Sequence, residues 1–307
     1  MGITGLEKDL MIQHKLKQAR DFESQGKYLH SIQIYHSLIS EFPDLVHAYL
    51  NLAILYEHIG NLKSAEDTFY KIVSITPDDD EMKIYFAQFL MRKMDWTGAV
   101  NVLNDSNPEN EPLASFLTGV SYMFLGEYEL AKINFLNFVI SDEQPELIYE
   151  AYLFLAKIEL KLKQYENALK HIRRAETLFD DYWELYLLYA KVYFEQDMGT
   201  HSIDYLRKAV RKNGENPLIH YWAGKIYLKF QEKIKAEAHL NHYLDLIDET
   251  SAEDFMDKVK LFLKSGKLKE AFFNFEIADC YIEKKNFAIR AKDESNYSSE
   301  KLDGTDD

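Results

Sequence analysis

The sequence is poor in the residues that interrupt helices, and this scarcity is the first guide to its fold. Among 307 residues there are only 12 Gly and 6 Pro. Most of them lie where a helix would end, which favours an all-helical chain over one rich in strands. Hydrophobic residues make up 47% of the chain and aromatic residues 14%. Because this is enough for a packed interior, the composition excludes a largely disordered protein.

Cysteine and long apolar runs are also scarce. The single Cys280 cannot form an internal disulfide, which excludes the secreted disulfide-rich class and favours a reducing compartment. No stretch reaches the roughly 18 uncharged apolar residues that a membrane-spanning helix needs. The first residues have neither the basic start nor the apolar core of a secretory signal, and Leu6 stands where a myristoylation motif requires Ser or Thr. We therefore expect a cytoplasmic protein without a membrane partner.

Positive charge is the third deficit. The chain has 36 Lys and Arg against 51 Asp and Glu, which gives a net charge of −15. An acidic surface repels the phosphate backbone of nucleic acids, so the charge argues against a nucleic-acid partner. The same surface speeds encounters with proteins that are basic overall, and it also keeps the chain soluble. The composition does not choose between these two roles.

What the sequence does contain is a repeat with two columns of small residues. The first column comprises Ala19, Ala53, Ala87, Gly119, Ala156, Ala190, Gly224 and the exception Val259. The second column follows twelve residues later and comprises Ser31, Ala65, Ala99, Ala131, Ala168, Ser202, Ala236 and Ala271. Successive gaps in both columns lie between 32 and 37 residues. A period of about 34 residues, with two helices that approach closely at small side chains, is typical of a helical solenoid.

The second repeat shows the pattern most clearly. It has Tyr49, Leu52, Ala53 and Tyr56 on one helix, Gly60 and Leu62 at the turn, and Ala65, Phe69 and Ile72 before Pro77. This repeat resembles the tetratricopeptide repeat family, whose members place aromatic, Leu, small and Tyr residues on the first helix, Gly at the turn, and Ala, Phe and Pro afterwards. The first and fourth repeats follow the same order, and the resemblance extends over almost the whole chain. It implies an all-α, right-handed α-solenoid of about eight antiparallel helix pairs.

The repeats also predict the domain organisation. We expect a lead-in over residues 1–11, a repeat array over 12–283, and a helix extension with a disordered acidic and Ser-rich tail over 284–307. The predicted repeats are 12–45, 46–79, 80–111, 112–148, 149–182, 183–216, 217–250 and 252–283. The column residues, the turn glycines and the terminal prolines are expected to pack and cap the helices, and not to bind a ligand.

In the tetratricopeptide repeat family the first helix of each pair lines a concave groove, so the resemblance implies where a partner binds. From the third repeat on, the flank predicted for this helix is apolar and aromatic, and Lys recurs at equivalent sites in three consecutive repeats. The predicted partner-binding residues are Tyr85, Phe116, Leu117, Val120, Phe124, Phe154, Lys157, Leu188, Lys191, Tyr221, Trp222 and Lys225. This flank suits an apolar segment, and its lysines suit a carboxylate. Three alternatives stay open: packing within the array, occupation by the chain's own C-terminal helix, and self-association.

The sequence carries no motif for catalysis or for a cofactor. It lacks a phosphate loop, a dinucleotide fingerprint, a nucleophile elbow and a Cys–His pairing. His239 and His242 lie three residues apart beside Glu237, a spacing that can hold a metal, but they sit on a second helix and have no further ligand in the pattern. We therefore expect no metal, no cofactor and no enzymatic activity.

The resemblance was also tested against the clamp with which some members of the family bind the C-terminal carboxylate of heat-shock chaperones. The matching positions here are Leu16, Arg20, Asn51, Glu81 and Tyr85. Only Asn51 fits, and Glu81 would repel a carboxylate, so the clamp is rejected. The sequence predicts a non-catalytic scaffold or adaptor that binds a protein or peptide with an apolar segment, possible alternatives being a self-associating structural protein and a regulatory subunit of an enzyme complex.

Overall fold

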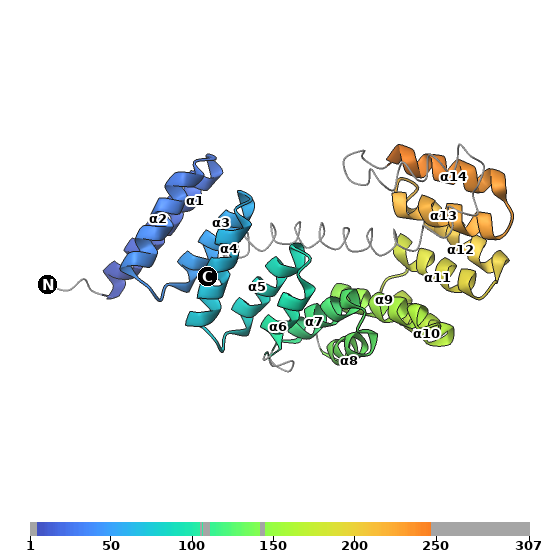
Figure 1. Ribbon diagram of the computed structural model, residues 1–307, viewed down its shortest axis with the longest axis horizontal. Helices are drawn as coiled ribbons and strands as arrows, with labels where there is room; N and C mark the ends of the chain where they lie inside the picture. The colour runs from blue at the N-terminus through green and yellow to red at the C-terminus, as the bar shows by residue number, and fades with distance from the viewer. Residues whose placement is uncertain (1–4, 105, 107–110, 142–144, 247–307) are drawn as a thin grey trace. The chain divides into compact units, whose positions relative to one another are not determined.

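The computed structural model describes residues 5–104, 106, 111–141 and 145–246. Within these ranges the chain is helical and has no strand: α1 (Gly5–Ser24), α2 (Tyr28–Glu41), α3 (Val46–His58), α4 (Leu62–Ile75), α5 (Asp80–Arg92), α6 (Trp96–Leu103), α7 (Pro112–Leu125), α8 (Tyr128–Phe138), α9 (Pro145–Lys161), α10 (Tyr165–Leu178), α11 (Trp183–Glu195), α12 (Gly199–Lys212), α13 (Pro217–Lys229) and α14 (Lys233–Leu246) (Figure 1). The predicted all-α class is confirmed. The predicted eighth repeat, 252–283, and the tail, 284–307, lie outside the described residues.

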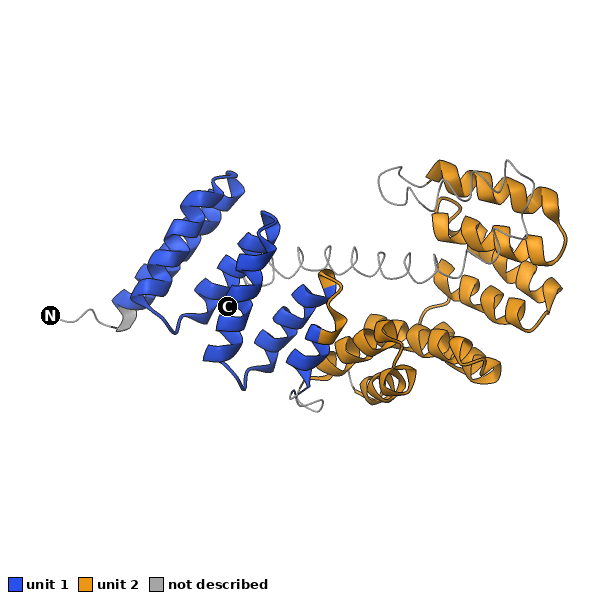
Figure 2. Ribbon diagram, in the orientation of Figure 1, with its two compact units in different colours: residues 1–91, 98–107 blue, residues 92–97, 108–307 orange. Residues whose placement is uncertain are grey.

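Two compact units make up the chain. Unit 1 comprises residues 1–91 and 98–107, and unit 2 comprises residues 92–97 and 108–307 (Figure 2). In unit 1, α1 packs against α2 and α3 packs against α4. Helix α1 begins at Gly5, inside the segment that the repeat pattern assigns to a lead-in.

Unit 2 is the larger unit and shows the solenoid arrangement in full. Its helices pack as the consecutive pairs α7 with α8, α9 with α10, α11 with α12 and α13 with α14. The first helices of these pairs also contact one another in order, α7 with α9, α9 with α11 and α11 with α13. We call these four helices the first-helix row. Such stacking of helix pairs is the α-solenoid that the sequence predicts.

The two small-residue columns lie where paired helices approach most closely. From Ala19 to Ala236 every member of both columns is buried. Gly224 shows why size matters, because a Cβ added there would lie 2.4 Å from the Cδ2 atom of Leu240. At Ser202 the small side chain also bonds across the pair, since its hydroxyl donates to the Ala190 carbonyl oxygen over 2.9 Å. The predicted core role is confirmed for the column residues up to Ala236, and Val259 and Ala271 lie outside the described residues.

The turn between the helices of a pair uses a left-handed residue, with or without glycine. Positive φ angles occur at Gly26 (70°), Gly60 (79°), Met94 (61°), Gly126 (84°), Lys163 (59°), Asp197 (58°) and Gln231 (65°). Each of these residues stands seven positions after a member of the first column. The left-handed turn that the sequence predicts at glycine is therefore present. The repeat keeps the same backbone geometry at non-glycine residues, for which a positive φ is unfavourable.

Replacing Lys163 by Gly should stabilise unit 2. A left-handed conformation costs an ordinary residue about 1–2 kcal/mol, and glycine avoids this cost. Glycine also makes the unfolded chain more flexible, which offsets about 0.5–1 kcal/mol of the gain. We expect Lys163→Gly to raise the free energy of unfolding by about 0.5–1 kcal/mol in urea titrations. Lys163→Ala is the control and should give no gain, because alanine bears the same strain; an equal gain in both variants would contradict a backbone origin.

Candidate functional site

The predicted partner-binding residues fall mainly on the first-helix row of unit 2. Helix α7 carries Phe116, Leu117, Val120 and Phe124, α9 carries Phe154 and Lys157, α11 carries Leu188 and Lys191, and α13 carries Tyr221, Trp222 and Lys225. Tyr85 lies on α5 in unit 1. Residues far apart in the sequence thus lie on four helices that pack in order. The lysines of this set occupy equivalent positions on three of these helices.

Most of the apolar residues in this set are buried. The Phe116 ring lies 5.1 Å from the ring of Phe138 and 5.9 Å from that of Phe154. Leu117, Val120, Leu188 and Tyr221 are likewise buried. Tyr85, Phe124 and Lys157 are half-buried. Because Phe116 packs against the neighbouring helices of unit 2, a polar residue in its place would damage the interior as well as any binding surface.

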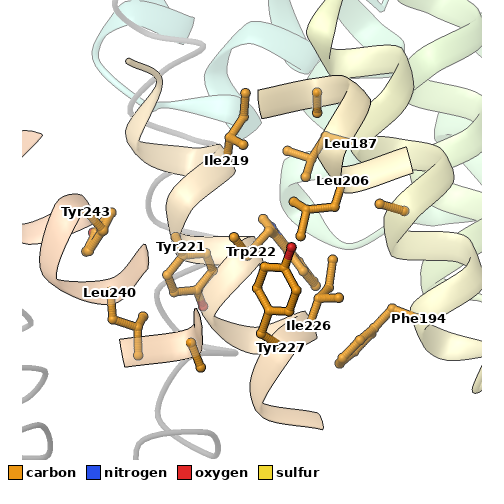
Figure 3. Close-up of a cluster of buried hydrophobic side chains, with 14 residues drawn as sticks. Leu187, Phe194, Leu206, Ile219, Tyr221, Trp222, Ile226, Tyr227, Leu240 and Tyr243 are labelled. Carbon is orange, nitrogen blue, oxygen red and sulfur yellow. The ribbon is translucent and has the colours of Figure 1, made fainter. Parts of the chain in front are cut away.

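A compact cationic cluster lies between α11 and α13. The Nζ atom of Lys191 is 4.2 Å from the centroid of the Trp222 ring, and the Nζ atom of Lys225 is 4.3 Å from the same centroid. Trp222 itself belongs to a buried hydrophobic cluster with Phe194 and Tyr221 (Figure 3). We call Lys191, Trp222 and Lys225 the Lys–Trp cluster. Its geometry is that of a cation–π contact in which one indole serves two ammonium groups.

Burial sets the chemistry of the Lys–Trp cluster. Only 7% of Lys191, 5% of Lys225 and 7% of Trp222 is exposed. A buried ammonium group is costly unless an anion or several hydrogen bonds compensate it. The Nε1 atom of Trp222 is also buried and has no hydrogen-bond partner among the described residues. Lys191 and Lys225 also make further interactions in the structure. Because all three side chains can only donate hydrogen bonds, any additional group that bonds to them is an acceptor, such as a carboxylate.

Two more lysines continue the cationic face along the row. Lys157 on α9 places its Nζ atom 5.0 Å from the Phe154 ring centroid. Lys229 on α13 lies 4.2 Å from the Phe194 ring centroid and is paired with Asp197 over 2.7 Å. The repeat pattern identified Lys157 but missed Lys229. The signal for Lys229 was its position four residues after Lys225, which places both on one side of α13.

The paired histidines that the sequence singled out lie beside a third. The Nδ1 atom of His239 on α14 is 2.8 Å from the Nδ1 atom of His220 on α13, and the ring centroid of His242 is 4.3 Å from that of His220. The Nε2 atom of His220 lies 2.6 Å from the Gly214 carbonyl oxygen. His220 must donate there, so its Nδ1 accepts from His239 when both rings are neutral. His220 escaped the sequence analysis because it lies on another helix.

The environment of these histidines favours their neutral forms. Burial, followed by the neighbouring imidazoles His220 and His242, lowers the pKa of His239 to about 4. Burial also lowers the pKa of His220. Across the described ranges no group of three or more His, Cys, Asp or Glu side chains is arranged to hold a metal ion. His220 and His239 therefore act on stability as a neutral pair.

Comparison with known proteins agrees with the repeat pattern. A family model for the tetratricopeptide repeat matches residues 16–80, and a second tetratricopeptide repeat model matches residues 149–182. A tetratricopeptide repeat protein from Parabacteroides merdae superposes with a TM-score of 0.64 at 18% identity, covering 82% of this chain and 97% of that one. The chain contains tetratricopeptide repeats at residues 16–80 and 149–182.

Other relatives of this tetratricopeptide repeat protein are more distant. Cut9 and Hcn1 form a hetero-tetramer of the APC/C, and a chain of that structure superposes with a TM-score of 0.57 at 18% identity, covering 80% of this chain and 47% of that one. The lipoprotein NlpI homolog of Haemophilus influenzae is 24% identical over 168 residues, which are 53% of this chain. The match covers 50% of that curated relative, so the chain spans about half of the relative's length. These likenesses show the fold, and the tetratricopeptide repeat models support a general role as a scaffold for protein interactions.

The tetratricopeptide repeat protein also exposes an apolar row that the sequence analysis missed. On α8 and just after it, Leu130, Ile133, Leu136 and Ile140 are 43%, 55%, 44% and 84% exposed. Leu130, Ile133 and Leu136 are spaced by three residues and lie toward one side of α8, and Ile140 follows the end of the helix. The flank predicted to bind a partner belongs to the first helices of the pairs, whereas α8 is a second helix.

No helix in the described part of the chain is both long and apolar enough to cross a membrane.

Proposed function

We propose that this protein is a non-catalytic scaffold that binds an apolar segment of a partner protein along the first-helix row of unit 2. The Lys–Trp cluster selects a segment that also carries carboxylates. Half-buried Phe124 and Lys157 extend the binding surface over α7 and α9, and half-buried Tyr85 is a separate contact in unit 1. The observation that carries the proposal is that two buried ammonium groups meet one buried indole in a chain whose net charge is −15.

The chemistry of the cluster narrows the partner. A protein that is basic overall is attracted to the acidic surface, while a local acidic and apolar segment is attracted to the Lys–Trp cluster. The two requirements are compatible, because the first acts at long range and the second acts in contact. A single stretch with a few anchors, after the cost of ordering it, binds with a dissociation constant near 1 µM, on the order of −8 kcal/mol.

Short helical peptides test this proposal directly. Three labelled peptides share one apolar face and differ only in carrying Glu, Gln or Lys at the same positions of the adjoining face. Fluorescence anisotropy with the full chain should show the Glu peptide binding near 1 µM, at least about tenfold tighter than the Gln peptide, with the Lys peptide weaker still. Equal binding of all three peptides, or binding of none, would refute the proposal.

Self-association is the second candidate, and the exposed apolar row on α8 favours it. We propose that a second copy of this chain covers Ile133 and Ile140, since these two are the most exposed members of the row. Ile133→Glu/Ile140→Glu should convert a concentration-dependent dimer to a monomer in sedimentation experiments. Because both side chains are exposed, the free energy of unfolding per monomer should change by less than about 0.5 kcal/mol. A wild-type chain that sediments as a monomer at every concentration excludes this candidate.

A further inference from the structure

Arginine is unevenly distributed along the chain. The sequence has seven Arg, and four of them lie on two second helices of unit 2: Arg173 and Arg174 on α10, and Arg207 and Arg211 on α12 (Figure 1). Together α10 and α12 carry seven Lys and Arg against three Asp and Glu, in a chain whose net charge is −15. The other second helices, α2, α4, α6, α8 and α14, are neutral or slightly negative. Positive charge is therefore concentrated on two helices that are not part of the first-helix row.

Helix stability alone does not account for this arrangement. Like charges four residues apart on a helix repel each other, and Arg207 and Arg211 form such a pair. The helix dipole favours cations in the last turn, which explains Arg211. The last turn of α10 has no basic residue, so the dipole does not explain Arg173 and Arg174. Bound anions would compensate the repulsion on both helices.

The four arginines are open to solvent. All of them are exposed, and Lys208 between the two arginines of α12 is exposed as well. One carboxylate lies 3.5 Å from Arg207, whereas the other three arginines have no carboxylate partner among the described residues. We call Arg173, Arg174, Arg207, Lys208 and Arg211 the arginine face. Unlike the buried Lys–Trp cluster, it is an accessible surface.

Stacked tyrosines join α10, α11 and α12 beside the arginine face. The ring of Tyr205 on α12 lies 4.5 Å from that of Tyr189 on α11, and the Tyr189 hydroxyl donates to Oε2 of Glu176 on α10 over 2.8 Å. The Nζ atom of Lys208 lies 4.5 Å from the Tyr205 ring centroid. Burial raises the pKa of Tyr205, and the charge of Arg173 on α10 lowers it. Cations from both helices thus lie near one tyrosine, so α10 and α12 present a single basic surface.

We propose that the arginine face docks an acidic segment of a partner protein. A guanidinium group binds a carboxylate through two parallel hydrogen bonds, which suits Arg better than Lys to this role. The segment needs no apolar anchor, so this surface is separate from the one proposed on the first-helix row, and the protein can hold two segments at once. The negative charge of the rest of the chain favours a short acidic segment over a nucleic acid, because a long polyanion would also meet that charge.

A labelled peptide of about 12 residues, in which Glu alternates with Ser and no side chain is apolar, tests the arginine face. In fluorescence anisotropy with the full chain at low ionic strength, this acidic peptide should bind with a dissociation constant on the order of 100 µM. Its Gln counterpart should bind at least about tenfold more weakly, and added salt should weaken the acidic peptide because exposed charges are screened. Equal binding of both peptides would overturn the proposal. Tighter binding of an oligothymidine with the same number of charges would overturn the choice of a protein segment.

Charge reversal locates the binding site. Arg174→Glu/Arg211→Glu should weaken the acidic peptide at least about tenfold. Lys63→Glu/Lys71→Glu is the matched control, because it changes the net charge equally at two exposed lysines of α4, a second helix of unit 1, and it should leave the affinity unchanged. Equal weakening by both variants would show an effect of net charge alone and would overturn the arginine face. So would unchanged binding by Arg174→Glu/Arg211→Glu.

A conservative variant guards against misfolding. Arg174→Lys/Arg211→Lys keeps the charge, and it should weaken the acidic peptide about threefold while circular dichroism stays unchanged, because Lys cannot form the paired hydrogen bonds. Equal binding by this variant and the wild type contradicts recognition by guanidinium groups.

The Lys–Trp cluster separates this inference from the proposed function. Lys191→Glu/Lys225→Glu should bind the acidic peptide within about twofold of the wild type, because the two surfaces share no residue. A tenfold loss in that variant would place the acidic peptide at the Lys–Trp cluster and overturn the arginine face. Failure of the apolar Glu peptide to bind, with the acidic peptide still bound, would refute the proposed function alone.

Discussion

Gly224→Ala should lower the free energy of unfolding of unit 2 by about 1–3 kcal/mol. The added Cβ would lie 2.4 Å from Cδ2 and 2.6 Å from Cγ of Leu240, whose side chain is 1% exposed. Leu240 is buried in a packed interior, so α13 and α14 must separate or the leucine must leave its rotamer. Urea denaturation followed by tryptophan fluorescence measures the change.

A double-mutant cycle shows whether Leu240 is the cause. Leu240→Ala alone creates a cavity and should cost about 2–4 kcal/mol. If the clash explains the effect of Gly224→Ala, the double variant should be no less stable than Leu240→Ala alone, because the smaller side chain makes room for the new methyl group. Simple additivity of the two losses would show that the effect at Gly224 arises elsewhere.

Lowering the pH should destabilise unit 2 through the histidine cluster. The pKa of His239 is lowered from 6.5 to about 4 in the folded protein, so the unfolded chain takes up a proton first as the pH falls. Stability is then complete above the unfolded pKa and is lost progressively between pH 6.5 and about 4, by about 3 kcal/mol in total for this residue. Between about pH 7 and pH 5 the expected loss is about 2 kcal/mol.

The groups that face His239 allow a clean control. On α13 it meets His220 and stacks on the Tyr227 ring at 5.4 Å, on its own helix it has His242, and Glu215 acts on His220 from the turn before α13. His239→Gln should remove most of the loss between pH 7 and pH 5, and what remains comes from His220 and from carboxylates. An unchanged pH dependence in His239→Gln would show that folding does not lower the pKa of His239.

The repeat pattern predicted the packing positions well because close approach leaves a local mark. A small residue at Gly224 or Ala190 is needed wherever two helices of a pair touch, so the requirement recurs with the period of the repeat. The left-handed turn was predicted only where the sequence has glycine, whereas the structure has the same turn at Lys163 and Asp197 as well. There the repeat geometry imposes the left-handed backbone against the preference of the residue, which no local pattern reveals.

The candidate site was predictable only in part. The flank of the first helices could be listed from periodicity, but burial at Phe116 depends on the neighbouring pair of helices, which periodicity does not describe. Lys191 and Lys225 stood out as equivalent positions, yet their meeting at Trp222 is a contact between repeats. The family pattern predicts no role for the positions of His220 and Ile133. The contact of His220 with His239 and the exposure of Ile133 could be found only from the structure.

Affinity of the labelled Glu and Lys peptides for charge-reversed chains tests the central claim most directly. The Lys191→Glu/Lys225→Glu variant should bind the Glu peptide about 30-fold or more weakly than the wild type does. It should bind the Lys peptide more tightly than the Glu peptide, because the charge of the cluster is inverted. Lys170→Glu should bind both peptides as the wild type does. If the double variant binds the Glu peptide as tightly as the wild type and circular dichroism confirms its fold, the Lys–Trp cluster is not the binding site.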